Sequence, residues 1–454
     1  MDAGDALPGQ REDRRERLRL MALPRPDGTP DALGRVSRMD FSPSPRAAEL
    51  ISLVSGFVTD EIEPVAEEYH RQVSASAATG TWAESQILGE LRAKARAKGL
   101  WNLFLPHPHG GHYASKFGTH GGAGLSNSDY APLAEQMGRA TFLAPYVFNC
   151  NAPDTGNMEV LLKYGTDQQK AEWLEPLLDG QIRSAFTMTE PGVASSDATN
   201  MEATAVVDAD EVVISGRKWW STGVGHPDCK IFVFMGLSDP EADRHNRHTM
   251  VLVPRDAPGV KVERLLSAMN AYDEPVGHGE VSFEDVRVPK DNILLGEGRA
   301  FEIAQGRLGP GRVHHCMRLI GQAELALELA IKRGLSRTAF GKPLVNLGGN
   351  RERIADARIA IDQARLLVLN AAWKLDVGGP LNALSEVSQI KVIVPNVAQQ
   401  VIDMAIQLHG GGGLSGDVPL SAMWTNARAL RLADGPDEVH RGVVARLEIS
   451  KHQS

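Results

Sequence analysis

The feature that most constrains the fold is a change in the spacing of apolar residues, which switches from helical to strand-like and then back. Over residues 46–185 apolar side chains recur every three or four positions, for example at Leu91 and Ala95, as expected for amphipathic helices. Short β-branched runs separated by Gly, Pro and Asp follow over residues 186–300. Longer helical stripes then fill residues 301–454.

The order of these three regions predicts the fold class. We expect an α+β multidomain chain with an N-terminal all-α domain (46–185), a central antiparallel β-barrel-like domain (186–300) and a C-terminal four-helix bundle (301–454). Residues 1–45 are rich in Arg, Pro and Asp and lack periodic apolar positions, which favours a mobile N-terminal tail. A chain of 454 residues is long enough to build more than one hydrophobic core.

Individual elements follow from the local patterns. Helices are expected from Ile87 to near Gly99, over 130–139, 158–164 and 167–178, and in two long stripes through 354–375 and 387–408. Strands are expected over 201–207, 212–215, 230–235, 249–253 and 280–288. The segment DADE at 208–211 separates the first two strands and predicts a hairpin turn.

Composition and charge exclude several classes of protein. Lys and Arg total 48 against 57 Asp and Glu, a net charge of −9, whereas nucleic-acid binding normally requires a basic face. Cys150, Cys229 and Cys316 form neither a disulfide framework nor a CxxC motif, which favours a reducing setting, the cytoplasm or a mitochondrial-type matrix. We expect no membrane span, because no run approaches the roughly 20 apolar residues that one needs. The N-terminus mixes Arg with Asp and Glu, unlike a secretory signal.

Two motifs near the α-to-β boundary indicate a binding site. Residues 186–197 (FTMTEPGVASSD) combine hydroxyl side chains with a Pro-Gly break, which keeps backbone groups out of regular pairing and available to the edge of a planar ligand; a polar interdomain turn is the alternative. Residues 216–223 (GRKWWSTG) place Trp219 and Trp220 side by side on a strand, so their indoles should point to opposite faces. An indole beside the Thr222 hydroxyl suits a flavin ring, and one core Trp with one interface Trp would fit equally well.

Two further motifs lie in the C-terminal region. Residues 337–342 (RTAFGK) contain Arg337, a rigid fork suited to a pyrophosphate, although an ordinary helix end would have the same sequence. Residues 411–416 (GGGLSG) formally match GxGxxG, with Asp434 about where a ribose-binding acid would follow. A Rossmann site requires a preceding strand and βαβ alternation, but a long helical stripe precedes this glycine run, so we reject that interpretation.

Together these motifs resemble the acyl-CoA dehydrogenase family, in the family's order and over residues 47–448. The matching strings are Thr189-Glu-Pro-Gly with Ser196-Asp197, Lys218-x-Trp220-x-Thr222, Arg337-x-x-Phe340-Gly-Lys and Gln407-x-x-Gly410-Gly411. The string RLADGPDEVH at 431–440 is most similar to the subgroup whose animal members are fused to a kinase-like domain, a domain that we do not expect in this chain. The resemblance implies a FAD-dependent oxidoreductase acting on the CH–CH group of an acyl-CoA thioester, as in fatty acid β-oxidation.

The resemblance also implies which residues bind the cofactor and the substrate. FAD contacts are expected from Phe186, Met188, Thr189, Ser196, Trp220, Thr222, Arg337, Phe340, Gln407, Gly410, Gly411, Pro436 and Glu438, and substrate contacts from Ser196, Gly311, Arg312 and Gly435. In the family the arginine and phenylalanine of the RxxFGK string reach the FAD of a neighbouring subunit, which implies a homo-oligomer, a dimer or a tetramer. This chain has Ala339 where the family often has Thr, so one polar FAD contact is expected to be missing.

Dehydrogenation beside a thioester requires a base for the α proton and a hydride acceptor for the β carbon, and the resemblance implies flavin N5 as the acceptor and a trans-2-enoyl-CoA as the product. The family usually supplies the base as a Glu followed by Gly, shortly before an Arg. The matching position is Asp434, before Gly435 and Arg441. Some members place the base just before the arginine that opens the first bundle helix, but here that arginine is Arg312 and its neighbour, Gly311, has no carboxylate. Asp434 is therefore the predicted catalytic base.

Electron transfer and metal binding complete the expectations. The resemblance implies that electrons pass to an electron-transfer flavoprotein; an acyl-CoA oxidase-type enzyme that uses oxygen and a non-catalytic flavin-binding scaffold are the alternatives. A carboxylate at position 434 argues against the scaffold. We expect no metal site: His107, His109, His112 and His120 lack nearby Cys or carboxylate groups, and residues 314–316 (HHC) are consecutive on a predicted helix and cannot share one face.

Overall fold

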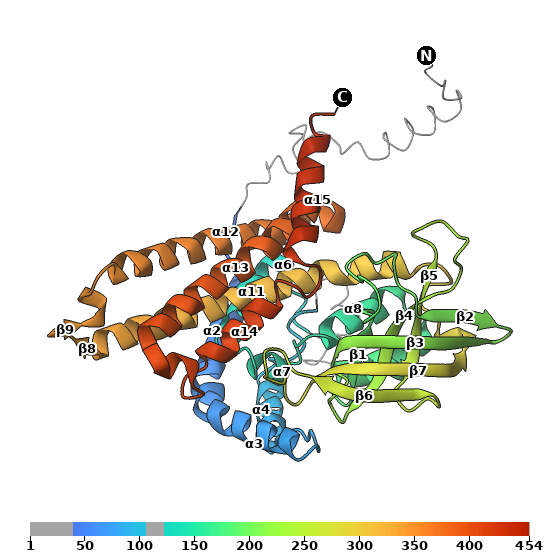
Figure 1. Ribbon diagram of the computed structural model, residues 1–454, viewed down its shortest axis with the longest axis horizontal. Helices are drawn as coiled ribbons and strands as arrows, with labels where there is room; N and C mark the ends of the chain where they lie inside the picture. Colours follow the sequence, from blue (N-terminus) through green and yellow to red (C-terminus); the bar gives the residue numbers. More distant parts are fainter. Residues whose placement is uncertain (1–39, 106–121, 454) are drawn as a thin grey trace. The chain divides into compact units, whose positions relative to one another are not determined.

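In a computed structural model of the chain, residues 40–105 and 122–453 are described, and every helix and strand below belongs to residues 43–453. Most of the predicted tail lies outside the described residues, as do His107, His109, His112 and His120. Figure 1 follows the order that the sequence predicts: helices, then strands, then long helices.

The N-terminal region is helical, as predicted. Its helices are α2 (Pro45–Phe57), α3 (Ala66–Ala78), α4 (Gln86–Ala97), α6 (Asn127–Gly138), α7 (Ala144–Val147), α8 (Asp154–Tyr164), α9 (Asp167–Gln169) and α10 (Glu175–Leu178), with π-helical turns at Val58–Ile62 and Lys170–Leu174. Side-chain caps explain where several of them begin: Ser85 accepts from the amide of Ile87, and Ser126 from that of Asp129. The predicted helices at 130–139, 158–164 and 167–178 are confirmed, with boundaries shifted by a few residues.

The central region is one seven-stranded sheet. Its strands are β1 (Arg183–Thr187), β2 (Thr204–Asp208), β3 (Glu211–Thr222), β4 (Cys229–Leu237), β5 (His248–Pro254), β6 (Val260–Leu266) and β7 (His278–Pro289). The order is β1-β4-β2-β3-β7-β6, with β5 beside β4. The predicted hairpin at 208–211 joins β2 to β3. The sheet is mostly antiparallel, as expected, but β4 pairs in parallel with β1 and, at one position, with β2. Strand β1 can run parallel to β4 because it enters the sheet directly from the helical region rather than through a hairpin.

The two faces of β4 contact different cores. Ile231, Val233 and Met235 join the helical core, whereas Phe232 and Phe234 pack inside the sheet against Phe283. Successive side chains of a strand point to opposite faces, so a strand that is covered on both sides has a continuous apolar run. This double burial explains why 230–235 could be recognised as a strand while giving no sign of which residues faced the helices.

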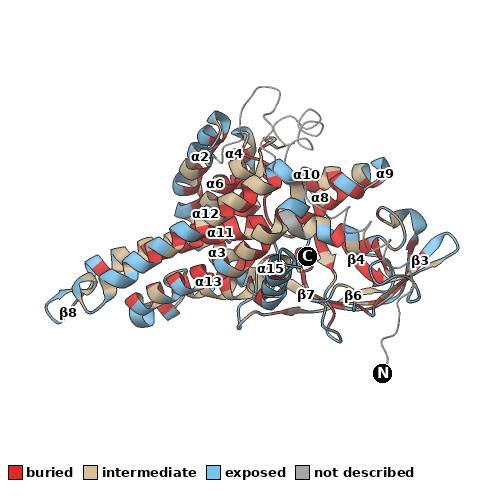
Figure 2. Ribbon diagram, turned by 90° about the horizontal axis from the view of Figure 1, so that it is seen from above, coloured by how far each residue is buried: buried red, intermediate tan, exposed pale blue. Residues whose placement is uncertain are grey.

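The C-terminal region consists of long helices. They are α11 (Ala300–Ser336), α12 (Asn350–Asn382), α13 (Leu384–His409), α14 (Leu420–Ala429) and α15 (Asp437–Ser450), with a short hairpin of β8 (Thr338–Ala339) and β9 (Lys342–Pro343) between α11 and α12. Helices α11, α12 and α13 pack on one another, and α6 packs on α11 and α12. Figure 2 shows the buried residues concentrated where these helices meet. None of the described helices is long and apolar enough to cross a membrane.

One detail of the sequence interpretation is wrong here. Arg312 was expected to open the first bundle helix, but α11 starts at Ala300, so Arg312 lies three turns inside it. That expectation came from the family resemblance, whereas in the structure α11 begins at Ala300 and packs against α13 and α6.

Candidate active site

Asp434 lies in a tight turn between α14 and α15, where its backbone adopts a left-handed conformation. Its φ is 55°, and that of the following Gly435 is 100°. A positive φ is uncommon for residues other than glycine, and Asp and Asn tolerate it better than most because of their short polar side chains. At Gly435 a Cβ would also lie 2.9 Å from the ring of His440. The Asp-Gly pair is therefore what the geometry of this turn requires.

Three helices hold the backbone of this turn. Arg312 on α11 donates through Nε to the carbonyl oxygen of Asp434 (2.9 Å), and His440 on α15 lies 3.2 Å from the same oxygen through Nε2. Lys391 on α13 is buried and donates to the carbonyls of Leu430 (2.6 Å) and Gly435 (3.2 Å). Because the carbonyl is bound from two sides, the Asp434 carboxylate can move only by rotation of its own side chain.

The carboxylate faces α11. Its Oδ2 lies 3.6 Å from Nε2 of His315, and its side chain is 21% exposed. Burial alone would raise the pKa of Asp434, but positive charge on His315, Arg307 and Arg312 outweighs it, so the pKa lies below the ordinary value. Burial and the neighbouring Arg318 lower the pKa of His315 to about 3, so at neutral pH the two arginines, and not the imidazole, carry that stabilising charge. Asp434 is thus ionised at neutral pH, as a proton acceptor must be.

The other carboxylates close to Asp434 in sequence are less suited to accept a proton from a buried substrate. Asp437 is buried and bound: Arg431 donates to its Oδ2 (2.9 Å), as does Asn396 (3.1 Å). Glu438 lies in the first turn of α15, and its side chain is 80% exposed. At Gly311, the alternative base position, a Cβ would meet no atom within 4 Å, so the space exists but the carboxylate does not.

Arg307 connects this turn to the first sequence motif. Its guanidinium carbon lies 3.9 Å from the ring centre of Phe186 at the end of β1, and its Nε donates to Asn157 on α8 (3.1 Å). Burial raises the pKa of Glu159, also on α8, to about 8, with the charge of Arg307 opposing the shift. Phe186, Arg312, Gly435 and Asp434 therefore belong to one neighbourhood, as the sequence predicts.

A buried ion pair joins the first motif to the second. Lys218 on β3 is fully buried and lies 2.7 Å from Glu190, and its Nζ also donates to the carbonyls of Met188 (3.0 Å) and Met235 (2.7 Å). Burial lowers the pKa of Lys218 to about 8, with Glu190 opposing the shift. The backbone amide of Trp219 donates to Thr189 (2.9 Å). Both residues belong to the motif strings, but the sequence gives no sign that they pair.

The expected alternation of the two tryptophans is wrong. A β-bulge shifts the register between Lys218 and Ser221, and Trp220 has a φ of 50°. The two indoles consequently lie edge to face with centres 6.4 Å apart, and Trp220 remains 41% exposed. The hydroxyl of Thr222 is 2.9 Å from Nδ1 of His278, whose ring centre is 5.7 Å from that of Trp220. Ser196 lies in the exposed loop that follows Pro191.

The remaining predicted cofactor residues do not reach this neighbourhood within one chain. Arg337 ends α11, 25 residues after Arg312 (337 − 312), which is about 37 Å along the helix. Phe340 lies in the β8–β9 turn and is 94% exposed. Figure 1 shows this hairpin at the end of α11 and α12 that is remote from the sheet. Gln407 lies in the last turn of α13, 16 residues after Lys391 (407 − 391), which is about 24 Å along the helix, and Gly410 directly follows α13.

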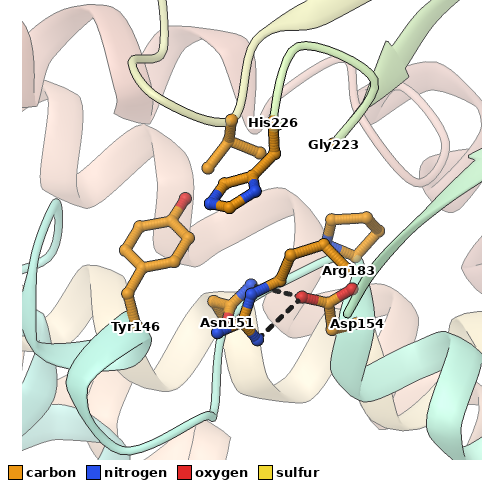
Figure 3. A pocket seen from close by; sticks show the side chains of 8 residues that line it. Tyr146, Asn151, Asp154, Arg183, Gly223 and His226 are labelled. Atoms are coloured by element: carbon orange, nitrogen blue, oxygen red, sulfur yellow. Dashed lines mark hydrogen bonds and ion pairs between the residues drawn. The ribbon is translucent and has the colours of Figure 1, made fainter. Parts of the chain in front are cut away.

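A second cluster of buried polar groups lies beside β1 (Figure 3). Asp154 accepts from the amide (2.8 Å) and hydroxyl (2.7 Å) of Ser184 and lies 3.4 Å from Arg183. The cavity between these groups and His226 has a volume of about 10 Å³, which is enough for about one water molecule. Because it cannot hold a substrate, we interpret this cluster as the anchor that fixes β1, and with it Phe186, to α8.

Comparison with known proteins identifies the family. Its profiles match in succession: "Acyl-CoA dehydrogenase, N-terminal domain" over residues 44–181, "middle domain" over 185–286 and "C-terminal domain" over 298–448. The Mycobacterium tuberculosis protein named probable acyl-CoA dehydrogenase FadE2 is 47% identical over 92% of this chain and 98% of its own length. The chain belongs to the acyl-CoA dehydrogenase family. This confirms the predicted family and fold, and with them the flavoenzyme class and FAD as the cofactor.

Two other members of the acyl-CoA dehydrogenase family add detail. Acyl-CoA dehydrogenase family member 10 of Mus musculus is 53% identical over 90% of this chain but only 37% of its own length, so the chain spans about a third of that relative. The predicted animal subgroup is confirmed by this relative. A solved structure from Mycobacterium abscessus, assigned as an acyl-CoA dehydrogenase, is 66% identical and superposes with a TM-score of 0.86 over 90% of this chain and 100% of that one.

The residues of this acyl-CoA dehydrogenase family member fit an FAD. A Cβ added at Gly410 or Gly411 would meet no atom within 4 Å, so a ligand can approach the backbone there closely. Trp220 and Phe340 present large exposed aromatic faces. Single exposed apolar residues are common, but these two aromatic residues each stand at a motif position and each have a positive φ, and their exposed faces suit a planar ring.

Proposed function

We propose that this chain catalyses the FAD-dependent α,β-dehydrogenation of an acyl-CoA thioester to the trans-2-enoyl-CoA, with Asp434 as the base that takes the α proton. The observation that carries the proposal is the ionised carboxylate of Asp434, largely buried in a turn whose backbone is held by α11, α13 and α15. A general base must be positioned before it can act, and this turn provides the positioning.

The residues around the turn have different roles. Arg312 and His440 bind the Asp434 carbonyl and so hold the main chain, while Arg307 and Arg312 keep the carboxylate ionised until substrate arrives. When the acyl chain excludes water, the desolvation that already raises the pKa of Asp434 grows, and the carboxylate becomes a stronger base. A backbone N–H near residues 434–435 would polarise the thioester carbonyl as negative charge develops on it.

The bound FAD supplies the hydride acceptor for the β hydrogen. Phe186, Met188, Thr189, Trp220 and Thr222 would hold its ring system, because the Lys218–Glu190 pair brings their strand ends together. Pro436 and Glu438 follow the Asp434 turn directly and would contribute from that side, as would the exposed Ser196.

We also propose a homo-oligomer, a dimer or a tetramer. Arg337, Phe340, Gln407, Gly410 and Gly411 lie too far along α11 and α13 to complete the site of their own chain. They would instead bind the FAD of a neighbouring subunit. A second chain would also cover the aromatic surface of Phe340.

The proposed electron acceptor is an electron-transfer flavoprotein, and the proposed setting is a reducing one, the cytoplasm or a mitochondrial-type matrix. All three cysteines are buried and unpaired, which supports such a compartment. The reaction is the first oxidative step of a fatty acid β-oxidation cycle.

The first experiment measures flavin content and flavin reduction. Purified protein should be yellow, contain about one FAD per chain, and bleach without oxygen when a suitable member of an acyl-CoA panel is added. The panel varies chain length, branching and hydroxylation, and so reads out substrate class at the same time. A protein that stays colourless after incubation with FAD would contradict the proposal.

The second experiment separates a dehydrogenase from an acyl-CoA oxidase. Turnover should require an electron-transfer flavoprotein or an artificial dye, with little hydrogen peroxide formed in air. Equal rates with oxygen alone, and peroxide in stoichiometric yield, would favour the oxidase.

A further inference from the structure

His315 is the side chain that faces the proposed base most directly. It lies on α11, with Nε2 3.6 Å from Oδ2 of Asp434, and the two side chains are 20% and 21% exposed. Its neighbour His314 points away, packing its ring against Tyr130 (centres 4.9 Å apart) and Phe104 (6.4 Å). Consecutive residues of a helix point in different directions, which is why no metal site is expected at 314–316. The two histidines consequently have different surroundings.

Arg318 determines which nitrogen of His315 carries the proton. Its Nη2 lies 3.2 Å from Nδ1 of His315, one helical turn earlier on α11. A guanidinium can only donate, so Nδ1 must accept and the imidazole proton must reside on Nε2. Nε2 is the atom that faces Asp434. Burial and the charge of Arg318 lower the pKa of His315 to about 3, so the ring is a neutral donor at neutral pH.

We propose that His315 is a positioning residue for Asp434: its Nε2–H donates to one carboxylate oxygen, selects the side-chain rotamer and leaves the other oxygen free to take the α proton. The inference rests on the proposed role of Asp434 as the base. At 3.6 Å the contact is longer than a hydrogen bond. Contacts of this kind often tighten when substrate binds.

The other charged groups around the carboxylate have different partners. Arg312 and His440 bind the Asp434 carbonyl, Lys391 binds the carbonyls of Leu430 and Gly435, and Arg307 binds Asn157 and covers Phe186. Cys316, next to His315, is directed at the carbonyl of Ile390. Of these groups Arg307, Arg312 and Lys391 set the charge of the site, while His315 is the donor directed at the carboxylate itself.

A hydrogen-bond donor that fixes one carboxylate oxygen is especially useful when the base is the short side chain of aspartate. Aspartate reaches roughly 1.5 Å less far than glutamate, so a small rotation of its side chain moves the accepting oxygen by a large fraction of its reach. Misplacement by about 1 Å can cost about 100-fold in rate. Fixing one oxygen therefore has more effect on an aspartate base than on the longer glutamate.

The test compares His315→Gln with His315→Asn, using anaerobic stopped-flow flavin reduction from pH 5 to pH 9. Gln places an amide N–H near the position of Nε2, whereas Asn, one methylene shorter, cannot reach it. We expect Gln to retain most of the rate and Asn to lose roughly tenfold to 100-fold. The acid limb for Asn should move to higher pH by about one unit, because a carboxylate that loses a donor binds its proton more tightly. His314→Asn, on the adjacent buried histidine, is the matched control and should leave the acid limb in place.

A direct titration provides a readout besides activity. The Asp434 carboxyl is followed by infrared difference spectroscopy across the pH range, with Asp434→Asn protein as the blank. The pKa of Asp434 should rise in His315→Asn and stay near the wild-type value in His315→Gln. Equal rates and equal carboxyl pKa values in the two variants would overturn the positioning role.

A double-mutant cycle separates this inference from the proposal on which it rests. In the Asp434→Asn background, His315→Asn should cause no further loss, because residues that act as a unit are non-additive. Fully additive losses would overturn the inference alone and leave Asp434 as the base. If Asp434→Asn by itself leaves flavin reduction unchanged, the proposed base is wrong, and the inference falls with it.

Discussion

The two halves of the proposed site differ in how complete they are within one chain. Around Asp434 the backbone carbonyls already have partners: Arg312 and His440 on that of Asp434, Lys391 on that of Gly435. At the other end of α11 and α13, Phe340 is 94% exposed and the glycine run at 410–412 borders open space.

The difference shows where a catalytic site must be preorganised and where it need not be. Charged groups can be held in a buried turn only if their hydrogen bonds are satisfied inside the fold, because an unpaired buried charge is very costly. A surface that binds the outer part of a cofactor can stay incomplete until a second chain binds, because its polar groups remain hydrated in the meantime at little cost in free energy. In the proposed site the backbone of the inner half is therefore held within the subunit, and the outer half would be completed by a neighbouring chain.

The largest effect is expected from a change in the inner half alone, at Asp434. Asp434→Asn should slow flavin reduction by about 10²–10⁴-fold, the usual loss when a positioned base is removed. Asn also tolerates the left-handed backbone of the turn, so folding should be unaffected. Anaerobic stopped-flow with one good acyl-CoA measures the rate, and FAD content and acyl-CoA binding should match the wild type. Unchanged flavin reduction would remove Asp434 from the mechanism and turn attention to Glu438.

Asp434→Glu sharpens the same comparison. The gap of 3.6 Å to His315 leaves little room for a side chain that is longer by roughly 1.5 Å. We expect Glu to be slower than Asp but faster than Asn in the same assay. A Glu variant equal to or faster than the wild type would show that the turn has the spacing of a glutamate-based site.

A smaller effect should be confined to the outer half. Arg337→Ala should weaken FAD binding by about tenfold to 100-fold, the value of a lost hydrogen bond to a charged group. At saturating FAD, flavin reduction should stay close to wild type, because Asp434 is untouched. Fluorescence titration of FAD gives the affinity, light scattering the mass of the assembly, and Arg353→Ala, an exposed arginine on α12, is the control. A loss of reduction rate at saturating FAD would show that the two halves are not separable.

The smallest expected effect is on folding stability, through the buried carboxyl group of Glu159 near Arg307. Burial raises the pKa of Glu159 to about 8, above its ordinary value of 4.5, so its protonated form suits the fold. Its contribution to stability is fully present below pH 4.5 and is lost as the pH rises through 8. Glu159→Gln cannot ionise, so its melting temperature relative to wild type should rise between pH 5 and pH 8 and level off above. The exposed Glu352→Gln should show no such trend.

The sequence predicted most elements and much of the neighbourhood of Asp434, for identifiable reasons. Helix α4 has a strong periodic pattern and strand β4 a continuous apolar run, and Phe186 and Gly435 lie in motifs that contribute to the family resemblance. Strand β1 was missed because its five residues, RSAFT, lie where the helical pattern ends and show no strand-like run of apolar residues. The bulge at Trp220 was missed because strand alternation is assumed until a register shift is observed.

The sequence by itself determined the α–β–α order, the family, the cofactor and the predicted base at Asp434, because short strings and apolar periods are properties of neighbouring residues. Only the tertiary structure decided that His315 rather than His314 faces that base, and that Arg318 sets its tautomer. It also decided that Lys218 and Glu190 join two motifs. Such contacts depend on the rotation of a helix and the register of a strand, which are set by many packing interactions across the core and leave no local mark in the chain.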